Sequence, residues 1–211
     1  KIHSHDKIHE LVGVMCSEIV GFLNNSYGTQ FESISDTDPW LIELEKQDAG
    51  VARSVRDHFK NSKSISSIVD SSCLKAIAED ILDMRLQVHD IIRLRTTIKD
   101  VDYTASRPHQ DLSLWLDDPH EINMWLPLVD ITEDLAPLQL WGDNSIELLP
   151  HTENEYGMLQ VAPELVKDLR SEYFLLKRGE VLVFGPRQLH SSMPNKTDKV
   201  RWSVDVRFKR V

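Results

Sequence analysis

Apolar residues in the first part of the chain recur at intervals of three and four, the spacing that places them on one face of an α-helix. Residues 8–19 show the pattern most clearly, with Asp6 as the expected N-cap and the turn-forming residues 24–28 as the end. The same pattern predicts helices over residues 39–44, 51–59 and 71–86. We expect these helices to form a packing layer and not a functional site.

From residue 88 onward the helical period gives way to short segments rich in β-branched, leucine and aromatic residues, separated by Asp, Asn, Gly and Pro. These segments predict strands over residues 91–98, 121–131, 135–141, 173–176, 181–184 and 200–208. Helices followed by many short strands favour an α+β protein whose β part is a sandwich or jelly roll. We expect one domain, with residues 1–87 as the helical layer and 88–211 as the β core.

The last predicted strand, residues 200–208, alternates strictly between apolar and polar residues. Arg201, Ser203, Asp205 and Arg207 occupy one face. In a half-exposed strand that face meets water, whereas in a jelly roll with a polar interior it lines a pocket. The second alternative predicts that Arg201 and Ser203 point together at one ligand. An arginine suits a carboxylate, which it can bind through two parallel hydrogen bonds.

Three residues carry the chemistry of a metal site. His109 and Asp111 are two apart, so on an extended segment both side chains point to the same face. With the later His190 they provide two imidazoles and one carboxylate, the facial triad of non-haem Fe(II) oxygenases. A His-x-Asp pair alone is a common chance pattern, so the hypothesis depends on its combination with His190 and the Arg-x-Ser pattern at Arg201. The donor set suits Fe(II) or Mn(II) and lacks the thiolates of structural zinc.

The composition is that of a soluble globular protein and excludes several classes of partner. The chain has 211 residues, enough for a full core, with 41% hydrophobic and 27% charged residues. A net charge of −10 argues against binding to nucleic acid or to an anionic membrane. Cys16 and Cys73 lie far apart, so we expect free thiols in a reducing, cytoplasmic compartment. No run of residues has the pattern of a membrane span or a signal peptide.

Residues 107–112 (Arg-Pro-His-Gln-Asp-Leu), followed by Trp125, then residues 190–192 (His-Ser-Ser) and Arg201, resemble the phytanoyl-CoA dioxygenase family of Fe(II)/2-oxoglutarate-dependent oxygenases. The resemblance spans roughly residues 91–208, and the preceding helices also suit it. It implies a double-stranded β-helix (a cupin-like jelly roll) with the N-terminal helices packed on one sheet.

The resemblance also implies a site. His109, Asp111 and His190 would bind Fe(II). The remaining site residues would bind the cosubstrate 2-oxoglutarate: Arg201 its distal carboxylate, Ser192 and Ser203 through their hydroxyls, and Trp125 by packing beside it.

The reaction implied is oxidation of a small organic substrate, most simply its hydroxylation, with O₂ consumed and succinate and CO₂ released. Asp111 favours this outcome, because relatives that halogenate lack the carboxylate. Two alternatives stay open. A cupin-type metalloenzyme that does not use 2-oxoglutarate would have no need of Arg201 and Ser192, and a catalytically silent jelly roll that binds a sugar or a protein would have no need of the metal triad. The sequence does not set the prime substrate or the oligomeric state.

The sequence departs from the family at one turn and leaves several weaker candidates. Where many members carry Pro-Gly-Ser-His, this chain has Trp-Gly-Asp-Asn-Ser at residues 141–145, so the family does not predict the shape of the substrate loop here. The irregular residues 143–167 are expected to form a loop over the site. No basic patch suggests a site for the phosphates of coenzyme A. Gln110 is a weaker candidate, and we expect it to pack away from the site. Other weaker candidates lie on predicted strands: Arg93, Arg95 and Asn123. The remaining ones are expected to be structural: Trp115, Trp141, His89, His120 and His151.

Overall fold

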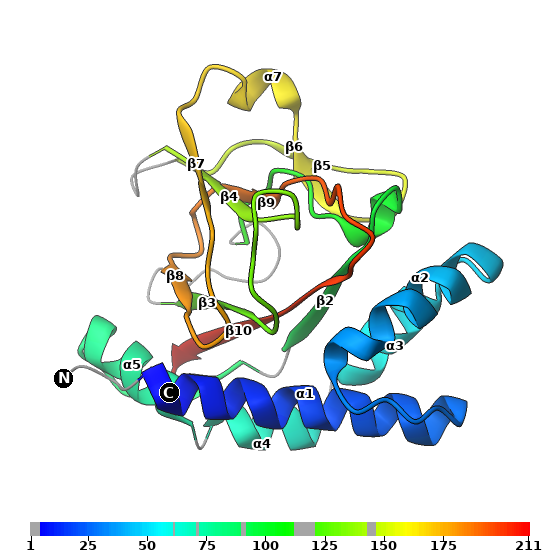
Figure 1. Cartoon of the computed structure of the whole chain (residues 1–211). Helices are drawn as coiled ribbons and strands as arrows, with labels where there is room; N and C mark the ends of the chain where they lie inside the picture. Colours follow the sequence, from blue (N-terminus) through cyan, green and yellow to red (C-terminus); the bar gives the residue numbers. More distant parts are fainter. Residues whose placement is uncertain (1–4, 61, 71, 90–91, 112–120, 143–146) are drawn as a thin grey trace.

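The computed structural model describes residues 5–60, 62–70, 72–89, 92–111, 121–142 and 147–211. Figure 1 shows a β core with a layer of helices along one side, the helices coming from the N-terminal part of the chain and the strands from the rest. The α+β class is therefore confirmed. In the part of the chain that the structure describes, every helix is too short or too polar to cross a lipid bilayer.

The helical layer agrees with the sequence pattern except at the ends of some helices and at one helix that was not predicted. Its members are α1 (His5–Tyr27), the 3₁₀ helix η1 (Ile34–Asp36), α2 (Thr37–Gln47), α3 (Val51–Phe59), α4 (Lys63–Asp70) and α5 (Cys73–Leu82). Asp6 lies within the first turn of α1 and is not its N-cap. The predicted helix over residues 71–86 was too long: Asp83 adopts a left-handed conformation, with φ 49°, which ends α5. Helix α4 was not predicted, because its serine-rich sequence has little helix propensity.

The strands form two larger antiparallel sheets and a hairpin. They are β1 (Leu86–Val88), β2 (Arg93–Thr97), β3 (Ile122–Pro127), β4 (Leu138–Trp141), β5 (His151–Glu153), β6 (Leu159–Val161), β7 (Ser171–Phe174), β8 (Leu182–Phe184), β9 (His190–Ser192) and β10 (Arg201–Arg210). One sheet has the order β1-β10-β3-β8 with β2 also beside β10, the second is β7-β4-β9, and β5 pairs with β6. Each unpredicted strand (β1, β5, β6, β9) has three residues, too few for a visible alternation.

Strand β10 has an apolar face and a polar face, which point to opposite sides of the larger sheet. Its apolar residues Trp202, Val204, Val206 and Phe208 are buried in one core together with the apolar faces of the helices. The helices therefore pack on one sheet, as the resemblance implied. Because side chains alternate along a strand, the polar residues of β10 project to the opposite side, into the space between the two sheets. A cavity there is lined from β3 and β10 of the first sheet and from β4 and β9 of the second.

A buried carboxylate connects the helical layer to β10. Asp38 of α2 is 6% exposed, and its Oδ1 accepts a hydrogen bond of 3.0 Å from the indole Nε1 of Trp202. Burial raises the pKa of Asp38 from 3.8 to about 6, against the opposing effect of this hydrogen bond. The folded protein therefore binds a proton at Asp38 more tightly than the unfolded chain does.

This difference predicts a pH-dependent contribution to stability. The pKa of Asp38 is 3.8 in the unfolded chain and about 6 in the folded protein. As the pH falls through this interval, the free energy of unfolding should rise, because the folded protein binds the proton first. Relative to Asp38→Asn, the wild type should gain about 1–3 kcal/mol between pH 7 and pH 4 in urea unfolding experiments. Asp168→Asn, at an exposed position, is the matched control. If the difference in the free energy of unfolding between the wild type and Asp38→Asn stays constant from pH 7 to pH 4, the prediction is contradicted.

Candidate metal centre

The backbone brings the two candidate histidines together. His109, in the loop before residue 111, and His190, at the start of β9, form an isolated antiparallel bridge. The backbone N–H of each donates to the carbonyl of the other, both at 3.0 Å. The ring centroids are consequently 4.3 Å apart. Two residues that are remote in sequence are thus held as a pair by the chain itself, before any ligand is considered.

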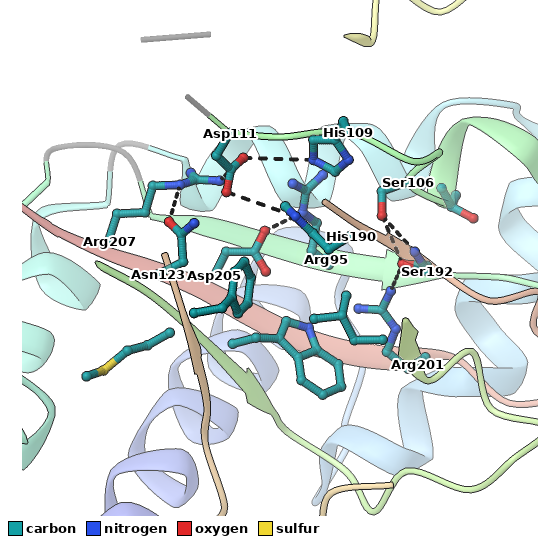
Figure 2. Close-up of a pocket in the computed structure, with 15 residues that line it drawn as sticks. Arg95, Ser106, His109, Asp111, Asn123, His190, Ser192, Arg201, Asp205 and Arg207 are labelled. Carbon is teal, nitrogen blue, oxygen red and sulfur yellow. Dashed lines mark hydrogen bonds and ion pairs between the residues drawn. The ribbon is translucent and has the colours of Figure 1, made fainter. Parts of the chain in front are cut away.

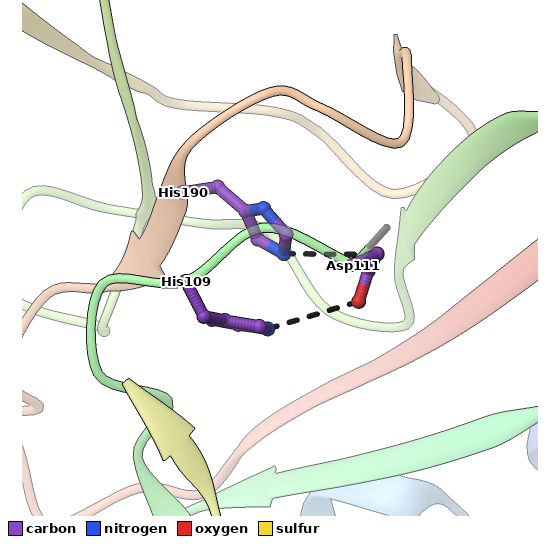
Figure 3. A group of neighbouring side chains, drawn as sticks. All are labelled: His109, Asp111 and His190. Atoms are coloured by element: carbon purple, nitrogen blue, oxygen red, sulfur yellow. Dashed lines mark ion pairs between the residues drawn. The ribbon is translucent and has the colours of Figure 1, made fainter. Parts of the chain in front are cut away.

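Asp111 completes a compact group with these two imidazoles (Figure 3). Its Oδ1 lies 3.8 Å from the Nε2 of His109, and its Oδ2 lies 4.0 Å from the Nε2 of His190. One potential ligand atom from each residue lies within 4.8 Å of the others, and all three side chains are buried. These separations suit three ligands on one face of a metal ion, with the opposite positions left for other molecules.

The hydrogen bonds of the two rings fix which nitrogen atoms face the centre. The Nδ1 of His109 lies 2.8 Å from the carbonyl of Arg107, and the Nδ1 of His190 lies 2.9 Å from the carbonyl of Gln188. A carbonyl oxygen only accepts, so each Nδ1 carries the proton and donates it. In a neutral ring with this tautomer, Nε2 is the nitrogen with a free lone pair, and in both residues Nε2 is directed at the centre. Burial, and secondly His190, lowers the pKa of His109 to about 3, which keeps that ring neutral.

Asp111 is held as an anion by a buried arginine (Figure 2). The Nη2 of Arg207 donates to Oδ1 of Asp111 at 2.8 Å, and the Nε of Arg207 donates to Oδ1 of Asn123 at 3.1 Å. Burial raises the pKa of Asp111, but Arg207, His190 and His109 together lower it more, and the pKa lies well below its ordinary value. The carboxylate is therefore ionised and oriented. The sequence placed Arg207 on the pocket face of β10 but assigned it no role.

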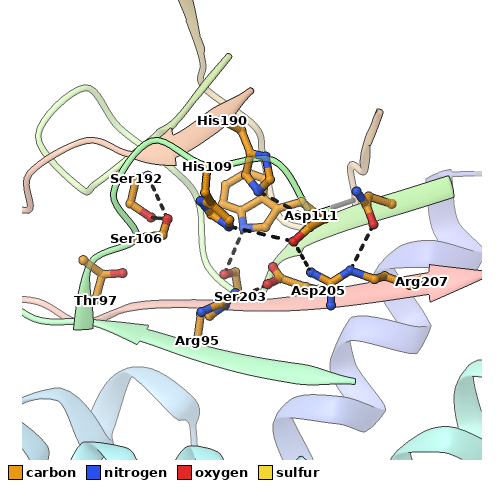
Figure 4. A network of polar contacts seen from close by, with 12 residues as sticks. Arg95, Thr97, Ser106, His109, Asp111, His190, Ser192, Ser203, Asp205 and Arg207 are labelled. Carbon is orange, nitrogen blue, oxygen red and sulfur yellow. Dashed lines mark hydrogen bonds and ion pairs between the residues drawn. The ribbon is translucent and has the colours of Figure 1, made fainter. Parts of the chain in front are cut away.

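Arg201 lines the same cavity and has hydroxyl partners (Figure 2). Its Nη1 donates to the hydroxyl of Ser203, and its Nη2 donates to that of Ser192 at 2.6 Å. Figure 4 shows both serines within the polar network of the site. The guanidinium carbon lies 5.7 Å from the ring centroid of Trp125, whose Nε1 donates to Ser203 at 3.0 Å. Of the four residues predicted to bind a cosubstrate, Arg201, Ser192 and Trp125 line the cavity, and Ser203 is hydrogen-bonded to Arg201 and Trp125. Ser106, which the sequence did not identify, connects the loop to β9: its hydroxyl accepts from the backbone N–H of Ser192 at 3.0 Å.

Arg201 is buried without a counter-ion. It is 2% exposed, its Nε has no hydrogen-bond partner, and within the residues that the structure describes no carboxylate forms an ion pair with it. Burial lowers the pKa of Arg201 to about 10, although the nearby Asp205 opposes the shift. Asp205 itself is engaged by Arg95, whose Nε donates to it at 2.7 Å. A buried guanidinium in this state favours an incoming carboxylate.

The weaker candidates divide between the cavity and the surrounding framework. Asn123 and Arg95 line the cavity. Gln110 faces away, as expected, and His151 is structural, since its Nε2 accepts from the backbone N–H of Gln110 at 3.0 Å. Trp141 belongs to a small core. Trp115, His120 and residues 143–146 lie outside the described residues. The backbone N–H of His89 donates to the carbonyl of Arg207 at 2.7 Å.

The stretch predicted as a loop over the site is more regular than expected. It contains the hairpin β5–β6 and a short helix, α7 (Pro163–Val166). The hairpin is attached to the His109 loop, because the backbone N–H of Val161 donates to the carbonyl of Pro108 at 2.7 Å. The hairpin lies beside the metal-ligand candidates, which agrees with the prediction of a segment over the site. It was not predicted to contain strands.

The buried His-Asp-His group between the two sheets has the donor set of a mononuclear non-haem metal site. Comparison with known families gives a more specific assignment. The profile of the phytanoyl-CoA dioxygenase (PhyH) family matches residues 33–203, and the chain belongs to that family. No curated protein sequence matched the chain.

Solved structures of related fold include several non-haem enzymes. A "non-heme monooxygenase", ThoJ in its apo form, has a TM-score of 0.63 and 17% identity over 98% of this chain and 70% of its own. EctD from S. alaskensis, in its apo form, has a TM-score of 0.62 and 18% identity over 100% of this chain and 71% of its own. The epimerase SnoN, solved with Fe³⁺, α-ketoglutarate and nogalamycin RO, has a TM-score of 0.56 and 18% identity over 74% of this chain and 62% of its own. These likenesses confirm the cupin-like jelly-roll fold.

Gln110 provides a test of how the loop between the two ligand candidates is held. It is completely buried, and its amide donates to the carbonyls of Glu147 and Arg187 while its Oε1 accepts from the N–H of Leu149. Gln110→Ala would leave these backbone groups unsatisfied, and we expect the free energy of unfolding to fall by about 2–4 kcal/mol. Urea unfolding measures the change.

The matched control is Gln47→Ala, which removes an exposed glutamine that donates only to Glu43 on the same helix. It should change the free energy of unfolding by less than about 0.5 kcal/mol. Equal effects of the two substitutions would show that Gln110 does not hold the loop.

Proposed function

We propose that the protein is a non-haem Fe(II)- and 2-oxoglutarate-dependent oxygenase that oxidises a small organic substrate with O₂. The proposal rests on one arrangement: a buried set of two imidazole Nε2 atoms and one carboxylate, beside a buried arginine that forms no ion pair with any described carboxylate. Membership of the phytanoyl-CoA dioxygenase family and the SnoN structure with Fe³⁺ and α-ketoglutarate support it.

The donor set fits Fe(II). His109, His190 and Asp111 would bind the metal, and their mixture of imidazole nitrogen and carboxylate oxygen is that of the non-haem iron triad. Both free cysteines lie elsewhere, Cys16 in the core of the helical layer and Cys73 packed against it, so no thiolate competes for the metal. The single carboxylate keeps one negative charge in the set, which Arg207 orients.

The second half of the cavity fits the dicarboxylate cosubstrate. Arg201 would bind the distal carboxylate, with Ser192 and Ser203 holding the guanidinium in place and available to share hydrogen bonds. Trp125 bounds this part of the cavity and is 2% exposed, so the ion pair would form away from bulk water. A cupin that does not use 2-oxoglutarate would gain nothing from such an arginine.

The chemistry depends on the bound groups, and the protein supplies their orientation. Iron with 2-oxoglutarate activates O₂, yields succinate and CO₂, and oxidises a nearby substrate. Asp111 and the two imidazoles would set the side from which these molecules approach the metal. Phe184, whose ring lies 4.9 Å from that of His190, and Leu138 provide apolar walls that exclude water. We propose hydroxylation as the outcome. SnoN, described as an epimerase, and SnoK, described as a carbocyclase, have other activities on the same fold.

Loss of the carboxylate should abolish activity. Asp111→Asn preserves the shape of the side chain but removes its charge, so we expect Fe(II) affinity to fall by at least about tenfold and iron-dependent succinate production to fall to background. Anaerobic iron titration and mass spectrometry of succinate provide the two readouts. Asp168→Asn, at the surface, should leave both unchanged. Succinate production by Asp111→Asn at the wild-type rate would rule out Asp111 as a ligand.

Loss of the arginine should affect the cosubstrate and not the metal. Arg201→Gln removes a charge-assisted contact worth about 1.5–3 kcal/mol, so the concentration of 2-oxoglutarate needed for half-maximal turnover should rise about ten- to a hundredfold. Fe(II) binding should not change. Arg201→Lys, which keeps the charge but not the paired donors, should have an intermediate effect.

Arg170→Gln is the matched control, because Arg170 is exposed and pairs only with Glu172 at the surface. If 2-oxoglutarate titrations of the wild type and of Arg201→Gln superimpose, Arg201 does not bind the cosubstrate. Iron-dependent oxidation that proceeds without 2-oxoglutarate would favour the alternative cupin-type metalloenzyme.

A further inference from the structure

A second cavity of about 250 Å³ adjoins the proposed active site, and its walls are strongly cationic. Arg95 lines both cavities, so the two are neighbours across one side chain. The second cavity is lined by Arg53, Arg56, Asp57, Lys60, Arg93, Leu94, Arg95, Tyr103, Tyr156 and Met158. Five cationic side chains in one cavity are unexpected in a chain whose net charge is −10.

The cations come from two elements that pack side by side. Helix α3 contacts β2, and Figure 1 shows the two next to each other. Arg53 and Arg56 of α3 and Lys60, the residue that follows the helix, are spaced at intervals of three and four, which places them along one face. Arg93 and Arg95 alternate on β2, opposite Asp205 and Ser203 of β10, and so share the interior face of the sheet. No basic patch is visible in the sequence, because these residues come together only when α3 packs against β2.

Few carboxylates neutralise this cluster. Arg95 is paired with Asp205 at 2.7 Å, and Asp57 lies on the wall of the cavity. In the described part of the chain, no ion pair involves Arg53, Arg56 or Arg93.

The guanidinium groups of Arg53 and Arg56 are held by an aromatic ring. They lie 5.0 and 5.4 Å from the ring centroid of Tyr103, whose hydroxyl donates to the buried Glu45. Glu45 also accepts hydrogen bonds from the backbone N–H groups of Gly50 and Ala52, both at 2.8 Å. The tyrosine is thereby fixed from behind, and it positions two cations without cancelling their charge.

The cations also act on one another. Burial, followed by Arg95 and Arg53, lowers the pKa of Arg56 to about 10. Burial, followed by Arg95 and Arg207, lowers the pKa of Arg93 to about 10, and the Nε of Arg93 is buried without a hydrogen-bond partner. Like charges held together in a partly desolvated cavity are unfavourable, and an anion bound between them would remove that cost.

We propose that this cavity binds an oxyanionic group, phosphate or carboxylate, of the primary substrate. Arg53, Arg56 and Arg93 would hold the anion, and the rest of the substrate would pass Arg95 toward the metal centre. The identity of the anchored molecule as substrate rests on the proposed function. The binding of an oxyanion by these arginines does not depend on it.

The test measures binding of inorganic phosphate and of acetate to the full chain by titration calorimetry, with and without saturating 2-oxoglutarate. The wild type and the control Arg170→Gln should bind one of the two anions equally well in both conditions. Arg53→Gln/Arg56→Gln should bind it at least about tenfold more weakly, because each substitution removes a charge-assisted donor. Arg93→Gln, on a different element, should weaken binding in the same direction. Thermal unfolding verifies that each variant is folded.

The outcomes separate the possibilities. Phosphate binding with this pattern assigns a phosphorylated substrate, and acetate binding with this pattern assigns a carboxylated one. Equal binding by the wild type and Arg53→Gln/Arg56→Gln, no binding of either anion, or displacement of the anion by 2-oxoglutarate would overturn the proposal. None of these results would affect the proposed use of iron and 2-oxoglutarate, which is tested by iron affinity and succinate production.

Discussion

The reciprocal backbone hydrogen bonds between His109 and His190 are the constraint on which the rest of the site depends. They tie the loop that carries His109 to β9, and β9 pairs with β4 of the smaller sheet. The N–H of Val161 adds a third attachment to the same loop, at the carbonyl of Pro108. Both rings donate a hydrogen bond through Nδ1 to a backbone carbonyl, so their Nε2 atoms are held toward one point as potential metal ligands.

The charges inside the jelly roll are organised by β10. Every second residue of this strand projects into the space between the sheets, and these residues differ in how they are neutralised. Arg207 is paired with Asp111, and Asp205 is paired with Arg95, so both pairs are balanced within the protein. In the described part of the chain, the guanidinium of Arg201 donates hydrogen bonds only to the hydroxyls of Ser192 and Ser203. The proposed site for an anionic cosubstrate depends on this unbalanced buried cation beside the candidate metal ligands.

Much of this arrangement could be predicted from the sequence. The alternation of residues 200–208 placed Arg201 and Ser203 on one face and left open whether that face meets water or lines a pocket. Both residues are buried in the structure, so the second alternative holds. His109, Asp111 and His190 were recognisable from their residue types and spacing, and the structure brings their side chains together. Their roles as ligands remain a proposal.

What the sequence could not predict depends on tertiary contacts. Ser106 is an ordinary loop serine until β9 supplies the N–H that its hydroxyl accepts. In the sequence, Arg53 and Arg56 are two charged residues of a predicted helix. Only the packing of α3 beside β2 places them near Arg93 in one cavity. Short elements such as β9 were missed for a similar reason: three residues carry no period, and their pairing is decided by β4.

The most direct measurement is anomalous diffraction at the iron edge from crystals of the full chain grown without oxygen in the presence of Fe(II) and 2-oxoglutarate. The account predicts a single iron bound by Nε2 of His109, Nε2 of His190 and the carboxylate of Asp111, with a carboxylate of 2-oxoglutarate on Arg201. Iron bound at another place, or 2-oxoglutarate bound away from Arg201, would contradict it.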